Sequence, residues 1–161
     1  MALGTIVIST LAGLIYGYLF DTNSTITRIN FNNTGVSFVL WQIISHNFLN
    51  SIVVICLSIF FYIGPSIPVI ITYFVFGDSF AVVFRKNGLL IALGTYPHFI
   101  LESIQILIIL AIAFKISRKI LDSVFSKYKN HVKKDGLLIN FCVANIFLIL
   151  AAIVEVIRLR A

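Results

Sequence analysis

Charged residues are scarce in this sequence. Of its 161 residues, only 11% are Asp, Glu, Lys or Arg, whereas 60% are hydrophobic. Soluble domains carry about 25% charged and about 45–50% apolar residues, so a soluble fold of this size would have too little polar surface to face water. The composition therefore excludes an ordinary water-soluble domain and indicates that the lipid bilayer surrounds most of the chain.

The alternating segments of about ten residues that are typical of a membrane β-barrel are also absent. Long unbroken runs of Ile, Leu, Phe and Val indicate helices instead. Each membrane-spanning helix needs about 20 mostly apolar residues, so the length leaves room for about four to six spans and no separate soluble domain. We predict an all-α, polytopic helical bundle that forms one membrane domain over residues 1–161.

Signatures of common hydrolases are missing as well. The sequence contains neither an HExxH zinc motif nor a GxSxG nucleophile elbow. Its two cysteines, Cys56 and Cys142, both lie inside apolar runs, so we expect buried free thiols that do not indicate a redox compartment. We accordingly expect no enzymatic activity, no cofactor and no bound metal.

Five apolar runs predict five spans, with kinked or broken helices in the centre. The predicted spans cover residues 3–20, 39–63, 67–84, 89–114 and 137–157. The segment 64-GPSIP-68 must break or kink a helix because prolines lack a backbone donor, and Gly94 with Pro97 does the same in the fourth run. Two half-helices that re-enter the membrane around residues 64–97 would fit equally well.

The charge distribution predicts an orientation. The polar segment 21–38 contains two glycosylation sequons, at Asn23 and Asn32, which favour the outer face. Basic residues concentrate in segment 115–135, which we place on the inner side by the positive-inside rule. They are Lys115, Arg118, Lys119, Lys127, Lys129, Lys133 and Lys134. We thus predict a multi-pass protein of the cell membrane with a cytoplasmic N-terminus.

The same basic segment has helical spacing and predicts an amphipathic helix lying on the anionic inner leaflet, although a simple connecting helix under the bundle is the alternative. A net charge of +6 would suggest nucleic acid in a soluble protein. Here the charges are explained by the membrane, and we expect no nucleic-acid partner.

Two further patterns concern the faces of the spans. Gln42, His46 and Asn50 recur every four residues and predict a polar stripe on an amphipathic helix that lies at, or enters from, the outer interface. Small residues allow close packing between membrane helices. They include a GxxxG pair near the N-terminus and alanines in the last run: Gly13, Gly17, Ala144, Ala151 and Ala152.

Ionisable residues inside an apolar run are the main candidates for function. His98, Glu102 and Gln105 fall on one face of a helix, and Asp78 on the preceding run is a candidate partner for them. Charges near the bilayer centre are costly, so they usually face the bundle interior or a wet cavity. A hydrogen-bonded network that holds helices together, a transport or proton pathway, and catalysis all remain open. His98 and Glu102 supply two zinc ligands at most, where a catalytic site needs about three. Glu155 lies near Arg158 and is interpreted as interfacial.

The order of several short motifs resembles the stage II sporulation protein M family. These motifs are His46-Asn47, Gly64-Pro65 with Pro68, Phe76-Gly77, and Pro97-His98 followed by Glu102. The resemblance covers roughly residues 40–155. Two departures mark the chain as a divergent member: Phe99 stands where members often have glycine, and the segment after Gly77 has no second glycine.

The resemblance implies a small polytopic membrane protein with no known chemistry of its own. The founding member anchors a complex of peptidoglycan-degrading partners during endospore engulfment. The family also includes many archaeal chains, and nothing in this sequence indicates sporulation. We therefore predict a scaffold or accessory subunit that acts through other membrane proteins in a hetero- or homo-oligomeric complex. A small transporter or permease-like subunit is the alternative, and an intramembrane enzyme comes third.

Overall fold

The computed structural model describes residues 2–20, 35–125 and 136–160, and these residues form helices joined by turns, without a β-strand. The helices are α1 (Ala2–Leu19), α2 (Val36–Cys56), the 3-10 helix η2 (Leu57–Phe60), α3 (Ile63–Asn87), α4 (Leu89–Thr95), α5 (Phe99–Phe125) and α6 (Leu137–Arg160). Five of them, with η2 continuing α2, are long and apolar enough to cross a membrane. The prediction of an all-α polytopic bundle with five spans is confirmed.

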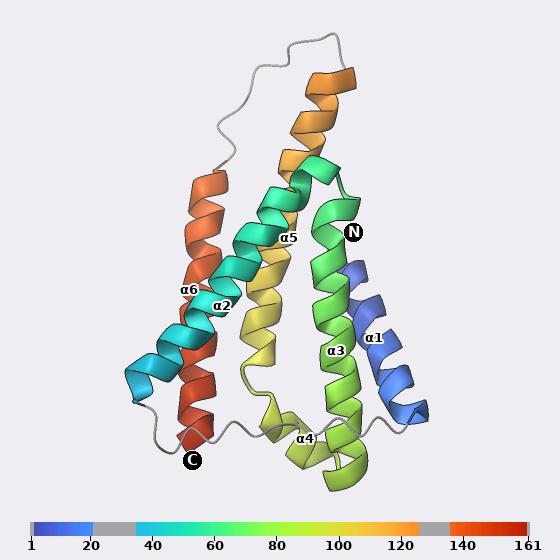
Figure 1. The fold of residues 1–161 in the computed structure, drawn as a ribbon, viewed down its shortest axis with the longest axis vertical. Coiled ribbons are helices and arrows are strands. Elements are labelled where there is room, and N and C mark those ends of the chain that lie inside the picture. Colours follow the sequence, from blue (N-terminus) through green and yellow to red (C-terminus); the bar gives the residue numbers. More distant parts are fainter. Residues whose placement is uncertain (1, 21–34, 126–135, 161) are drawn as a thin grey trace.

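The long helices run between two ends of the bundle (Figure 1). At one end, here called the α4 end, lie α4, the start of α2 and the C-terminal end of α6. At the other, here called the η2 end, lie η2, the last turns of α5 and the start of α6. Helices α1 and α3 run in the same direction, and α2 and α5 run in the opposite one.

The chain reverses just before the Gly/Pro segment, which itself forms the first turns of α3 and places Pro68 inside that helix. The chain reverses at Phe61, which has a φ of +56°, and α3 begins at Ile63. A Cβ on Gly64 would collide with the carbonyl oxygen of Leu57, so glycine is required at this close approach. Pro65 lies in the first turn of α3, where the missing N–H removes no helical hydrogen bond. Because α2 with η2 and α3 are each 25 residues long, the alternative of two re-entrant half-helices is wrong.

Glycines hold α1 against α3. A Cβ on Gly13 would overlap the carbonyl oxygen of Phe74, and one on Gly17 would lie 2.5 Å from Asp78 Oδ1. From the opposite side, a Cβ on Gly77 would overlap the carbonyl oxygen of Thr10. The two backbones therefore touch because three side chains are missing, which is the packing that the GxxxG pair predicts.

Helices α2, α5 and α6 form the second part of the bundle, beside α3 (Figure 1). The α6 side contributes small residues, since Ala144, Ala151 and Ala152 are fully buried, as the sequence predicts. Both cysteines are free thiols, but they are exposed on the outside of the bundle. The expectation of buried thiols is wrong because an apolar run in a membrane helix has a lipid-facing side as well as a buried one.

The fourth predicted span is divided into two helices. Gly88, with a φ of +82°, separates α3 from α4, and α4 ends at Thr95, just before Pro97. Helix α5 then runs for 27 residues, or about 40 Å, which exceeds the roughly 30 Å hydrocarbon core. Residues 115–125 continue α5 without a break, and the expectation of a separate surface helix is wrong for them.

Candidate functional site

The break between α4 and α5 determines where the ionisable residues of the fourth apolar run lie. Pro97 and His98 lie in the turn, and the amide of Glu102 donates to the carbonyl oxygen of His98 at 3.1 Å in the first turn of α5. Proline has no N–H to continue a helix and disfavours helical geometry in the residue before it. His98 consequently lies at the α4 end of α5, and Glu102 lies one turn further into the bundle.

A polar cleft lies beside this turn. Its volume is about 470 Å³. It is lined by Gln42, Ile43, His46 and Asn47 of α2, by His98 and Glu102, and by Glu155 of α6. Gln42 and His46 are exposed, whereas Asn47, His98, Glu102 and Glu155 are half-buried. The cleft therefore has an accessible rim on α2 and a less accessible floor formed by α5 and α6.

Three ionisable side chains meet on that floor. His98, Glu102 and Glu155 each offer one atom with a lone pair, and these atoms all lie within 4.8 Å of one another. Nδ1 of His98 is buried and has no hydrogen-bond partner among the described residues. Burial lowers the pKa of His98 below its ordinary value, and the positive charge of Arg158 lowers that pKa further. The imidazole is thus held in its neutral form, in which it can act as a ligand.

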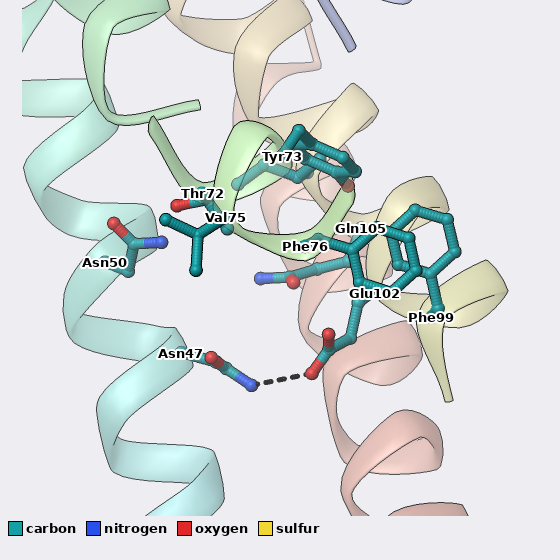
Figure 2. A pocket seen from close by; sticks show the side chains of 10 residues that line it. Asn47, Asn50, Thr72, Tyr73, Val75, Phe76, Phe99, Glu102 and Gln105 are labelled. Atoms are coloured by element: carbon teal, nitrogen blue, oxygen red, sulfur yellow. Dashed lines mark hydrogen bonds between the residues drawn. The ribbon is translucent and has the colours of Figure 1, made fainter. Parts of the chain in front are cut away.

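A second cavity of about 240 Å³ continues from Glu102 toward the middle of the bundle. Figure 2 shows its lining, in which Asn47, Glu102 and Gln105 approach from α2 and α5, and Tyr73, Phe76 and Phe99 close the other side. Asn47 Nδ2 donates a hydrogen bond of 3.0 Å to Glu102 Oε1. Asn47 and Glu102 line both cavities, so this pair forms the boundary between them.

Hydrogen bonds connect α2 to α5 at three levels. One turn nearer the η2 end than the Asn47–Glu102 bond, Gln105 Nε2 donates to Ser51 Oγ at 2.7 Å, and Ser51 Oγ donates to the carbonyl oxygen of Asn47 at 2.9 Å. Near the η2 end, Ser117 Oγ donates to the carbonyl oxygen of Ser58 at 3.0 Å. Buried polar groups in a membrane bundle need such partners, and these bonds set the register of the two helices.

Between the second and third of these levels the interior is apolar. Val54, Ile109, Leu110 and Ala113 are 0% exposed, and Leu148 is 1% exposed. The described residues thus contain no polar connection from Gln105 to Ser117 through the core.

The structure brings together most of the residues that the sequence singles out. His98 and Glu102 share the cleft, and Glu102 and Gln105 share the second cavity. The predicted stripe also faces these spaces, with Gln42 and His46 in the cleft and Asn50 in the second cavity. Asp78 is placed elsewhere: it lies against Gly17 of α1, on the other side of α3.

Sequence reasoning missed Glu155, which it interpreted as an interfacial residue beside Arg158. Helices α5 and α6 are antiparallel neighbours, so the start of α5 and the end of α6 lie at the same level (Figure 1). That argument from topology would have placed Glu155 next to Glu102.

The remaining candidates concern the surface. Lys115, Arg118 and Lys119 lie in the C-terminal half of α5, where Arg118 Nε pairs with Asp122 Oδ2 at 4.0 Å. The other predicted basic residues and both sequons lie outside the described residues: Lys127, Lys129, Lys133, Lys134, Asn23 and Asn32.

Comparison with protein families shows to which family the chain belongs. The model of the family described as stage II sporulation protein M matches residues 1–157. The chain belongs to this family. The match includes α1, which lies outside the region of resemblance noted in the sequence. No curated protein and no solved structure matches the chain.

The structure shows what the motifs of this stage II sporulation protein M relative do. Gly64 permits the turn between α2 and α3, Gly77 permits the contact with α1, and Pro97 separates α4 from α5. Phe99, where members often have glycine, stacks on Phe76 with ring centroids 3.5 Å apart and an interplanar angle of 4°. The phenylalanine that stands in place of the usual glycine thus forms an aromatic pair between α3 and α5.

Proposed function

We propose that this protein is a non-enzymatic scaffold or accessory subunit of a complex in the cell membrane, and that the cleft at the α4 end receives another membrane protein. The observation that carries the proposal is the combination of an accessible polar rim with a closed interior. A transport pathway needs polar groups or water across the whole membrane, whereas here Val54, Ile109 and Leu110 fill the core between Gln105 and the η2 end. A cleft that meets an apolar core is suited to binding.

The proposed orientation places the cleft on the outer side. Lys115, Arg118 and Lys119 lie toward the η2 end of α5, and segment 126–135 adds further lysines. Basic residues close to the ends of spans favour the cytoplasm. The α4 end, and with it the cleft, would then face outward, and the N-terminus would be cytoplasmic.

The lining of the cavities supports the absence of catalysis in this proposal. A covalent mechanism requires a nucleophile beside a base. Among the described residues, neither cavity is lined by a serine or a cysteine. The hydroxyl groups of Thr72 and Tyr73 line the second cavity together with Glu102, and neither His98 nor His46 lines that cavity.

The experiment is purification from native membranes in mild detergent, with quantification of co-purifying membrane proteins. We expect a stoichiometric partner with the native chain, and its loss when the accessible rim is altered by Gln42→Ala with His46→Ala. Leu138→Ala is the matched control, because Leu138 is 75% exposed on α6 near the η2 end. Recovery of the native chain alone would contradict the proposal. Flux of a solute through liposomes that contain only this protein would support a transporter instead.

A further inference from the structure

The floor of the cleft holds three side chains that belong to the ligand types of transition metals. We propose that His98, Glu102 and Glu155 bind one divalent ion of the zinc class. The sequence provides two of these ligands four residues apart, and the fold adds the third from α6. This site goes beyond the proposed scaffold function, since it concerns the chain alone and needs no partner.

The separations fit a metal site after a small closure. Zn²⁺ lies about 2.0–2.2 Å from imidazole nitrogen and carboxylate oxygen, so tetrahedral ligand atoms lie about 3.4 Å from one another. The three ligand atoms here lie within 4.8 Å of one another. No separation therefore has to shorten by more than about 1.4 Å. Rotation of the glutamate side chains, which are half-buried at the edge of a 470 Å³ cleft, can supply that change.

Two other observations point to a ligand at this place. His98 Nδ1 is buried without a hydrogen-bond partner among the described residues, and an unpaired buried polar atom is unfavourable unless something binds it. In addition, Asn47 Nδ2 holds Glu102 Oε1 at 3.0 Å, which orients the carboxylate and leaves its second oxygen available. A hydrogen bond of this type to a ligating group is a regular feature of metal sites.

The local charge also favours a divalent cation. Two carboxylates placed together at membrane depth repel each other and are costly to desolvate. Arg158, which acts electrostatically on His98, supplies one positive charge and leaves a net negative charge when both carboxylates are ionised. Imidazole favours zinc and similar metals, whereas Mg²⁺ and Ca²⁺ prefer oxygen ligands throughout. Three protein ligands would leave one coordination position on the cleft side.

The test is zinc binding by the purified, untagged full-length protein in detergent, after removal of metal by a chelator. Calorimetric titration with Zn²⁺ should give one site per chain, unaffected by millimolar Mg²⁺ or Ca²⁺, and elemental analysis after dialysis should give the same stoichiometry. Glu155→Gln and His98→Ala should each weaken binding at least tenfold. Zinc should also raise the melting temperature of the native chain and leave that of Glu155→Gln unchanged.

Controls separate this site from other zinc-binding groups and from loss of folding. His46→Ala removes a cleft histidine outside the three-residue cluster, and His131→Ala removes the remaining histidine of the chain; both should bind zinc normally. Glu155→Asp keeps a carboxylate and should retain weaker binding, which guards against a Glu155→Gln variant that fails to fold. Absence of zinc binding by the native chain, or equal binding by folded Glu155→Gln, would overturn the proposal. Because His46→Ala should weaken partner binding but not zinc binding, failure of one proposal is distinguishable from failure of the other.

Discussion

Replacement of Gly13 by valine tests how α1 is attached to the bundle. An added Cβ would overlap the carbonyl oxygen of Phe74 and lie 3.0 Å from the backbone nitrogen of Asp78. Both obstacles are backbone atoms of α3, so the side chain cannot turn aside and the helices must separate. Overpacking of this kind costs about 1–3 kcal/mol, which exceeds the few tenths of a kcal/mol that valine gains over glycine in helix propensity.

Gly4→Val is the matched control on the same helix, because a Cβ on Gly4 meets nothing within 4 Å. Its expected effect on the free energy of unfolding is within about 0.5 kcal/mol. The assay is thermal unfolding in one detergent, in which Gly13→Val should lower the melting temperature by about 2–4 °C per kcal/mol for a chain of this size. Equal melting temperatures for the two variants would refute the glycine-mediated contact.

Three further predictions concern polar contacts, pH and orientation. Ser51→Ala should lower the free energy of unfolding by about 1–3 kcal/mol, since it leaves the buried Gln105 amide without its partner; adding Gln105→Leu should recover part of that loss in the same melting assay. In metal-free protein, the contribution of His98 to stability should decrease between pH 7 and pH 5, because the lowered pKa of His98 means that this side chain binds more protons in the unfolded chain there. The difference in melting temperature between the native chain and His98→Asn should therefore change between pH 7 and pH 5, and a constant difference would contradict the assignment. Reporter fusions should place the N-terminus in the cytoplasm and the C-terminus outside; both ends on one side would contradict five spans.

Much of the fold follows from composition and from a few residues. Apolar runs separated by polar or Gly/Pro segments predict five spans, and the structure confirms them. Gly13 and Gly17 predict a close helix contact, and Pro97 predicts the break before α5. These features are local, since a missing side chain or a missing N–H has the same physical effect wherever the partner helix lies.

The partners of each residue could not be predicted in the same way. Asp78 and Glu102 are both acidic residues in apolar runs, yet Asp78 lies against α1 and Glu102 accepts a hydrogen bond from Asn47. Which face of α3 turns toward α1 depends on Gly77 fitting between Thr10 and Leu14, a contact between distant parts of the sequence. The sequence thus predicted the α5 residues of the candidate site, and it predicted the α2 residues as an interfacial stripe. The contribution of Glu155 from α6 became evident only in the structure.

The central claim is that the cleft at the α4 end is the surface that binds a partner protein. The most direct measurement is photo-crosslinking in the native membrane, with a photoreactive amino acid placed at Gln42 on the rim or at Leu138 on the lipid-facing side of α6. The account predicts one discrete crosslinked protein from position 42 and lipid adducts alone from position 138. Lipid adducts alone from both positions would contradict it.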